Sequence, residues 1–262
     1  DNYINWMKNE NRPLLSNDII KENLFPILKR KNKVVFILID GLTTDLWKNM
    51  RDILYKYYKI KTEYGLSILP TNTTFSRNSI FSGMFPDELM RMYPKEWAEL
   101  WKDEKSRNRY ENKFFKDQLN RYGFNDSTVE YKKIYTLEQG KKLSENINDN
   151  KHFDVLALVV NFVDILGHTR LESSVVQEMV PDISSYRSVV INWMENVWLL
   201  KVLVEISTWG HEVIITSDHG MQLVKKPIIV KGDRLTSKGI RSKYGKNLDL
   251  PSKQALVIKE PE

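Results

Sequence analysis

Three acidic residues and two histidines follow apolar stretches of the sequence, in positions where they could hold metal ions. Asp40, Asp164 and Asp218 each come directly after such a stretch. His168 lies four residues beyond Asp164, and His219 immediately follows Asp218. Carboxylate oxygens and imidazole nitrogens without sulfur suit zinc or manganese, whereas oxygen ligands alone would suit magnesium or calcium. A single aspartate after a strand is equally consistent with a helix cap, so the complete set is what indicates a metal site.

The number of these donors exceeds the needs of one tetrahedral ion and nearly suffices for two. Two cations roughly 4 Å apart stabilise the attacking and leaving oxygens of a phosphoryl transfer. Asp164 and His168 would meet over one turn of a helix. Asp218 and His219 are adjacent and would point apart on a strand, so the chain must turn there, as Gly220 permits. The pattern therefore predicts a two-ion site suited to phosphoryl transfer.

The stretch 70–77 supplies a candidate nucleophile, because it places several hydroxyl groups between a predicted strand and a predicted helix. A hydroxyl at the amino terminus of that helix would lie among unpaired N–H groups, where a phosphate binds readily. A threonine hydroxyl activated by a metal ion would need no histidine base. Arg77, one turn into the helix, could bind the phosphate through two hydrogen bonds. The alternatives are an ordinary helix cap for Thr73 and a surface ion pair for Arg77.

Buried strands must bring these side chains together. Apolar, β-branched runs at 33–39, 155–163 and 213–217 predict strands that end at the acidic residues. In an open α/β sheet, ligands bind at the carboxyl ends of the strands. The remaining elements predicted are a short strand at 65–69, helices at 44–58, about 74–82 and 184–208, and a closing strand at 254–258. The predicted fold is therefore α/β, with a mixed or parallel sheet sandwiched by helices.

Two segments depart from this pattern. Residues 1–31 are amphipathic, and we interpret them as a helical lead-in or the end of an upstream linker. Residues of about 85–128 are charged and aromatic, and predict an inserted helical cap within a domain that spans 32–262. A further strand and helix, from 129 to 147, follow the cap. The aromatic side chains of the cap fit core packing better than a base-stacking platform.

Length and composition fit one large domain. The chain has 262 residues, of which 41% are hydrophobic, and contains no cysteine, so disulfides and thiolate metal sites are excluded. No apolar run is long enough for a membrane span, and we expect a cytoplasmic protein without membrane insertion. The net charge of +6 favours anionic partners, although a Lys-rich composition makes this weak evidence. The chain begins at Asp1 and stops at Glu262, and we expect it to be truncated at its carboxyl end.

These motifs together resemble the alkaline phosphatase and nucleotide pyrophosphatase/phosphodiesterase superfamily. Within it, the sequence is similar to the PglZ domain and to PorX-type response regulators of the type IX secretion system. The resemblance covers nearly the whole chain from about residue 33. The stretches that carry it are Asp40-Gly41, 67–83, 161–164 with His168, Asp218-His219-Gly220, 228–234 and 241–248.

This resemblance implies a zinc-dependent phosphodiesterase that hydrolyses linear or cyclic oligonucleotides, as the output domain of a response regulator. It implies two Zn²⁺ ions, with Mn²⁺ as an alternative, and Thr73 as nucleophile. It also implies a receiver domain, a sigma factor or secretion regulators, and a second copy in a homodimer as partners. The implied ligands are Asp40, Thr73, Asp218 and His219 for one ion, and Asp164 and His168 for the other.

One departure from the superfamily concerns the second ion. A further histidine normally follows the Asp-His pair, yet no histidine follows His219 in this sequence. His152 and His211 precede their strands, and a strand of eight residues spans roughly 26 Å, so both should lie at the wrong end of the sheet. We expect the missing ligand beyond Glu262, or else a weakly held second ion.

A basic run follows the metal motif and could form a groove for a polyphosphate backbone. Arg241 and Lys243 are the preferred substrate-binding members, because they lie in a stretch that carries the resemblance. The alternative is a solvated surface. The run consists of Lys225, Lys226, Lys231, Arg234, Lys238, Arg241, Lys243 and Lys246.

A second hypothesis is a signalling or oligomerisation module whose metal site is structural or incomplete, which the missing histidine favours. A third is a sulfatase-like hydrolase or phosphomonoesterase. Sulfatases use a modified cysteine or serine as nucleophile, so a chain with no cysteine and with Thr73 at that position argues against a sulfatase.

Overall fold

A computed structural model describes residues 2–9, 11–100, 107–221, 228–233, 243 and 247–250. The chain forms two compact units, 1–220 and 221–262. The first unit contains the sheet. In the described part of the second unit, Lys231 and Asp249 form an isolated antiparallel bridge, and the side chain of Asn247 donates to Asp233. The predicted strand at 254–258 lies outside the described residues.

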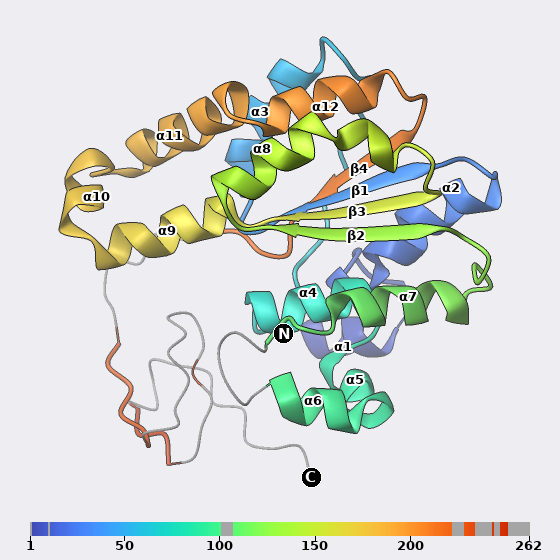
Figure 1. The fold of residues 1–262 in the computed structure, drawn as a ribbon. Helices are drawn as coiled ribbons and strands as arrows, with labels where there is room; N and C mark the ends of the chain where they lie inside the picture. The colour runs from blue at the N-terminus through green and yellow to red at the C-terminus, as the bar shows by residue number, and fades with distance from the viewer. Residues whose placement is uncertain are drawn as a thin grey trace. The chain divides into compact units, whose positions relative to one another are not determined.

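Four parallel strands form the sheet, in the order β2-β3-β1-β4 (Figure 1). The central strands β1 and β3 are buried along their whole length, as parallel strands covered on both faces must be. The edge strands β2 and β4 are more exposed. The strands are β1 (Val34–Ile39), β2 (Val129–Ile134), β3 (Val155–Val160) and β4 (Glu212–Thr216). The predicted α/β class is confirmed.

Helices cover both faces of the sheet (Figure 1). Alternate residues of each central strand point to opposite faces, so Val35 and Ile37 pack in one core while Val34 and Phe36 pack in the other. The first core is closed by α3 (Thr44–Leu54), α8 (Leu137–Glu145), α11 (Ile183–Asn196) and α12 (Leu199–Ser207). The second is closed by η2 (Ile20–Leu24), α2 (Phe25–Lys29), α4 (Thr73–Ser82) and α7 (Glu111–Arg121).

The amino-terminal segment is less regular than predicted. Its helices are interrupted around Pro13, which removes a backbone donor and fixes its own φ. The segment contains α1 (Tyr3–Lys8), η1 (Ser16–Asp18), η2 and α2. The strand predicted at 65–69 is wrong: among the described residues, the pairing found there is an isolated parallel bridge between Leu15 and Leu66. The stretch at 65–69 therefore pairs with the amino-terminal segment and not with a strand of the sheet.

Two long elements of the prediction are divided in the structure. The strand predicted at 155–163 ends at Val160, and α9 (Phe162–Glu172) follows, then α10 (Ser174–Met179). The helix predicted at 184–208 breaks into α11 and α12 at Val197, whose ψ of −106° is not helical. Trp198 is buried at this break, so the kink places a large side chain in the core.

The predicted cap contains α5 (Pro86–Met92), α6 (Pro94–Leu100) and α7. Phe114 and Phe115 of α7 are fully buried in the core between α7 and the sheet. At these positions, the prediction that the aromatic side chains serve core packing is confirmed. The remaining short helix is η3 (Ile147–Asn150). Among the described helices, none has the length and apolar character needed to traverse a lipid bilayer.

Candidate functional site

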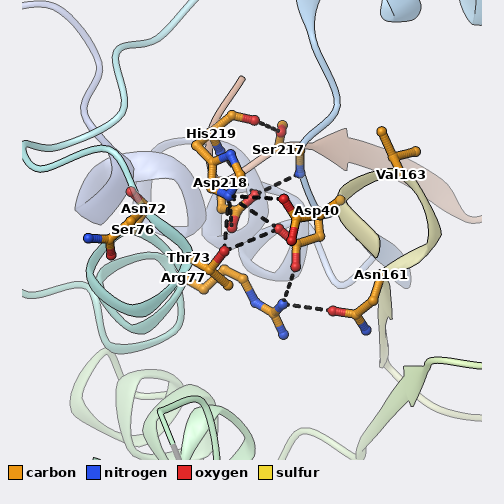
Figure 2. Close-up of polar contacts among 12 residues, drawn as sticks. Asp40, Asn72, Thr73, Ser76, Arg77, Asn161, Val163, Ser217, Asp218 and His219 are labelled. Carbon is orange, nitrogen blue, oxygen red and sulfur yellow. Dashed lines mark hydrogen bonds and ion pairs between the residues drawn. The ribbon is translucent and has the colours of Figure 1, made fainter. Parts of the chain in front are cut away.

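The carboxyl ends of three parallel strands bring the predicted acidic residues together. Asp40 directly follows β1, and Asp218 lies two residues beyond β4. Asp164 comes from the first turn of α9, just after β3. The register pairs Ile39 with Val160, so β1 and β3 end at the same level. Asp40 and Asp218 both lie beside His219 (Figure 2), and Asp164 Oδ1 lies 3.9 Å from the same imidazole.

Gly41 permits the closest approach in this cluster. Its φ of +73° is a left-handed conformation that favours glycine. A Cβ atom there would lie 3.3 Å from the Cβ of Asp164. The backbone N–H of Gly41 also donates to Asp218 Oδ1, at 3.2 Å. A residue without a side chain at this turn therefore lets β1, α9 and the Asp218 turn meet.

Helix α4 presents the Thr73 hydroxyl to this cluster. Asn72 caps the helix, since its side chain accepts from the N–H of Phe75 at 3.0 Å. The alternative role of Thr73 as the helix cap is therefore wrong, and its Oγ1 is available for chemistry. That oxygen lies 2.9 Å from His219 Nε2 and 3.5 Å from Asp40 Oδ1.

The atoms around His219 Nε2 are spaced as metal ligands would be. Besides Thr73 Oγ1, this nitrogen lies 3.5 Å from Asp40 Oδ1, 3.6 Å from Asp218 Oδ2 and 3.9 Å from Asp164 Oδ1. A tetrahedral zinc with bonds of about 2.0 Å separates its ligand atoms by roughly 3.3 Å. The distances from His219 Nε2 to these four oxygens are therefore close to the spacing of ligands around one such ion.

Asp218 shows most clearly that this cluster suits a cation. Its Oδ1 accepts from the N–H groups of Gly41 and His219. Its Oδ2 is buried and has no hydrogen-bond donor within the described part of the chain. Leaving a buried carboxylate oxygen without a partner is costly unless a cation compensates it. The donor set and this unsatisfied atom both fit a bound metal ion.

The electrostatics of the cluster lead to the same conclusion. Burial raises the pKa of Asp218 well above its ordinary value, and repulsion from Asp40 raises it further. Burial also raises the pKa of Asp40, although the charge of Arg77 opposes this shift. The folded protein thus disfavours two negative charges at this position, and a divalent cation would relieve the repulsion.

Asp164 and His168 form a second pair on α9. Asp164 Oδ2 lies 3.3 Å from His168 Nε2, as expected for residues four apart on a helix. Burial alone would raise the pKa of Asp164, but the hydrogen bond and charge of His168 bring it below its ordinary value. The same hydrogen bond raises the pKa of His168. A pair of this kind can supply two ligands to a second ion.

The described residues offer no third histidine at this edge of the sheet. His152 and His211 precede β3 and β4, so both lie at the amino ends of the strands, as the sequence predicted. The group of described residues whose donor atoms are close enough to hold one ion is Asp40, Asp164 and His219. A second ion would therefore depend on Asp164, His168 and ligands from outside the protein or outside the described residues.

Arg77 was expected to bind phosphate, and its position in the structure argues against that role. Its guanidinium group is buried, with a side chain only 3% exposed. It contacts Asp40, Asn161 and Glu111 within the protein. The alternative of a surface ion pair is also wrong, because the pair is buried. Sequence reasoning missed Glu111, which no motif distinguishes from the other charged residues of the cap.

The two other expected substrate-binding residues lie in the second unit. Arg241 falls outside the described residues, and so do most residues of the basic run. Lys243 is described and exposed to solvent. A substrate-binding role for both residues therefore stays a prediction.

The amino-terminal segment supports the loop that leads to Thr73. Tyr3 Oη accepts from the N–H of Leu69 at 2.8 Å, and Ser16 Oγ accepts from the N–H of Ile68 at 3.1 Å. On the other side of this loop, the Ser67 hydroxyl donates to the carbonyl of Asp218 at 2.7 Å. These bonds connect the amino-terminal segment, the loop before Thr73 and the turn that carries Asp218.

A parallel α/β sheet with these side chains at its carboxyl edge defines an alkaline-phosphatase-like domain. The family model described as BREX system PglZ alkaline phosphatase-like domain matches residues 19–254. The chain therefore belongs to the PglZ family, and membership supports a hydrolase of the phosphoesterase type. No curated protein matches this sequence.

Proposed function

We propose that this protein is a zinc-dependent phosphodiesterase with Thr73 as its nucleophile. The observation that carries the proposal is the position of the Thr73 hydroxyl, 2.9 Å from His219 Nε2 and 3.5 Å from Asp40 Oδ1. Nitrogen and oxygen donors without sulfur favour zinc, with manganese as the alternative. Asp40, Thr73, Asp218 and His219 would hold one ion, and Asp164 and His168 the other.

The reaction would proceed in two displacements at phosphorus. The Thr73 hydroxyl loses its proton and its oxygen attacks the phosphodiester, the bond from phosphorus to one ester oxygen breaks, and the leaving alcohol takes up a proton. Water then attacks the phosphorus of the resulting threonine-linked diester and the bond to the Thr73 oxygen breaks, which releases a phosphomonoester and restores the Thr73 hydroxyl. Bound cations would lower the pKa of the attacking hydroxyl and stabilise charge on the attacking and leaving oxygens. The amino terminus of α4 directs its dipole towards the same phosphate.

We propose linear or cyclic oligonucleotides as the substrate class. The support is the family resemblance, the net charge of +6 and the concentration of basic residues at 225–246. Arg241 and Lys243 are the favoured contacts to the phosphate backbone. Arg77 is left out of this role because the protein's own carboxylates engage its guanidinium group.

The test compares wild type with two alanine variants in the hydrolysis of bis(p-nitrophenyl) phosphate with added zinc. Thr73→Ala should lose activity by at least about 10³-fold, as happens when a covalent nucleophile is removed. Thr71→Ala, which removes a hydroxyl two residues away, should retain most of the activity. Substantial turnover by Thr73→Ala would contradict the mechanism, and turnover that survives complete chelation would contradict the metal requirement.

A second candidate function is a signalling or oligomerisation module with little catalysis. The observation in its favour is the pair Asp164 and His168, to which the described residues add no further histidine. Zinc that changes the mass of the protein in light scattering, without any turnover, would support this module over the enzyme.

We also propose that the domain acts as the output of a response regulator, with a receiver domain, secretion regulators or a sigma factor as partners. The support is the sequence resemblance. The amino-terminal segment offers a route for such control, because Tyr3 and Ser16 bond to the backbone of the nucleophile loop. In a full-length protein, beryllofluoride on the receiver domain should change the rate of hydrolysis; an unchanged rate would contradict this role.

A further inference from the structure

The carboxylates around His219 Nε2 each direct one oxygen into the cluster. For Asp218 this oxygen is Oδ2, since Oδ1 is occupied by two backbone N–H groups. Asp40 is arranged in the same way. Its Oδ1 lies 3.5 Å from both Thr73 Oγ1 and His219 Nε2, while its Oδ2 accepts from Arg77 Nη1 at 2.8 Å (Figure 2). Only one oxygen of Asp40 is therefore free to bind a cation.

Arg77 is itself fixed by a carboxylate on α7. Its Nε donates to Glu111 Oε1 at 2.8 Å and its Nη2 donates to Glu111 Oε2 at 2.9 Å. These two parallel bonds form the bidentate pair that sets the plane of a guanidinium group. The remaining nitrogen, Nη1, is shared between Asp40 and Asn161 Oδ1, at 2.8 and 2.9 Å.

Glu111 is held at least as firmly as Arg77. It is fully buried, yet its carboxylate also accepts from Tyr131 Oη at 2.6 Å and Asn108 Nδ2 at 2.7 Å. Lys133 Nζ pairs with it at 2.7 Å. Burial would raise the pKa of Glu111, but the charges of Arg77 and Lys133 lower it to about 2. Glu111 thus stays ionised and joins α7 and β2 to the metal-binding edge.

Stability alone is a weak explanation for this network. Replacing a buried ion pair by apolar side chains of similar volume is often neutral or stabilising, because the charges must lose their hydration. The network instead controls the direction of one carboxylate. If Arg77 released Oδ2, Asp40 could turn and bind an ion through both oxygens, which would crowd the position of the Thr73 hydroxyl.

We propose that Arg77 is a positioning residue that holds Asp40 as a one-oxygen metal ligand, and that Glu111 fixes Arg77 in this orientation. The inference rests on the proposed function, since it requires a cation at the cluster. It assigns α7 of the predicted cap a role in metal binding, although no residue of α7 belongs to the proposed ligand sets.

The test measures zinc affinity by competition with a fluorescent chelator. Glu111→Gln keeps the shape of the side chain and removes its charge. Its zinc dissociation constant should rise by roughly 10–100-fold, the usual effect of losing a group that orients a metal ligand. Arg77→Lys keeps the positive charge but loses the planar fork, and should show a loss of the same order.

Asp117→Asn is the matched control, because it neutralises a carboxylate on the same helix. Asp117 pairs with Lys113 at 2.8 Å on the exposed side of α7. Its zinc affinity should equal that of wild type. Thermal melting with and without zinc separates the two roles of Glu111: a purely structural role lowers both midpoints equally, whereas a positioning role also reduces the increase that zinc produces.

Tyr131→Phe is a milder second variant, useful where Glu111→Gln does not fold. It removes one hydrogen bond to Glu111 and should weaken zinc binding by roughly threefold. Zinc affinity equal to wild type in the folded variants would overturn the inference while leaving the proposed function intact. A wild-type protein that binds no zinc would overturn the proposed function, and this inference with it.

Discussion

Both ends of the sheet carry histidines, but these histidines have different neighbours at the two ends. At the carboxyl end, His219 faces a hydroxyl and three carboxylates, and His168 pairs with Asp164. At the amino end, the ring nitrogens of His211 lie 3.3 Å and 3.2 Å from the backbone carbonyls of Trp209 and Lys151. The two ends therefore differ in the groups that surround their histidines.

The amino end is also more open and more basic. A basin of about 740 Å³ lies there, lined mainly by basic, polar and aromatic side chains. Lys33 Nζ donates to the carbonyl of His152 at 2.7 Å. The lysines and histidines at this end thus contact backbone oxygens or solvent, whereas Asp40, Arg77 and Asp218 at the carboxyl end are buried. A cation should be bound at the carboxyl end alone.

The largest difference should appear in the free energy of unfolding when an arginine is removed. Arg77→Met would remove the buried positive charge between Glu111 and Asp40, and should lower the free energy of unfolding by about 3–5 kcal/mol. Arg30 at the amino end pairs with Glu212 at 2.8 Å, but both side chains are about half exposed. Arg30→Met should cost at most about 1 kcal/mol. Urea unfolding of both variants in chelator measures the contrast, and equal losses would contradict it.

The next effect concerns the histidines themselves. His219→Ala should weaken zinc binding by at least about 100-fold, since loss of a direct ligand exceeds the loss of a group that only orients one. His211→Ala removes an imidazole from the amino end and should leave zinc affinity unchanged. Isothermal titration of both variants provides the measurement. A large loss in His211→Ala would show that the ion binds elsewhere.

Two glycines with nearly equal backbone angles offer a matched comparison. Gly41 has a φ of +73° and Gly210 a φ of +74°, at opposite ends of the sheet. Alanine at either position should lower the free energy of unfolding by about 1–2 kcal/mol, because its Cβ disfavours the left-handed conformation. A Cβ at Gly210 meets no atom within 4 Å, whereas one at Gly41 would lie 3.3 Å from Asp164.

Gly41→Ala should therefore also weaken zinc binding severalfold, while Gly210→Ala should not. Chemical denaturation gives the stability of each variant, and chelator competition gives its affinity. Equal zinc affinities for the two variants would indicate that the close approach of Asp164 does not shape the site.

The smallest effect is a difference in pH dependence, measured without metal. The hydrogen bond to Asp164 raises the pKa of His168 above its ordinary value of 6.5, so the stability it provides is complete below pH 6.5 and is lost as pH rises through the folded pKa. Burial lowers the pKa of His211 below 6.5, so its stability is complete above pH 6.5 and is lost as pH falls towards the folded pKa.

Replacement of either histidine by glutamine should remove the pH dependence of stability that this histidine causes. His168→Gln should flatten the stability curve above pH 6.5, and His211→Gln should flatten it below. Because both side chains are partly exposed, each change should stay below about 1 kcal/mol. Urea midpoints across this range test the signs, and changes on the same side of pH 6.5 for both variants would contradict them.

Sequence reasoning found the strands and the side chains that cluster at their carboxyl ends because both have local signals. The apolar runs before Asp40 and Asp218 predict buried strands, and the carboxyl ends of parallel strands must lie at one edge. The break at Val197 could not be predicted, because it depends on where the core accepts Trp198. The strand expected at 65–69 failed because its neighbour is the irregular lead-in rather than the sheet.

The buried positions of Arg77 and Glu111 could not be predicted from the sequence for a different reason. A charged residue in a polar helix is usually exposed, and Glu111 lies within a stretch rich in both charges. Its burial follows from the packing of α7 on α4, which involves segments more than thirty residues apart. The cap of Asn72, by contrast, did have a local signal: an asparagine directly before the helix.

Anomalous diffraction at the zinc edge, from crystals grown with zinc, tests the central claim most directly. The account predicts a peak bounded by Asp40 Oδ1, Thr73 Oγ1, Asp218 Oδ2 and His219 Nε2. The second oxygen of Asp40 should remain bonded to Arg77. A zinc peak at the amino end of the sheet, with none among these four atoms, would contradict it.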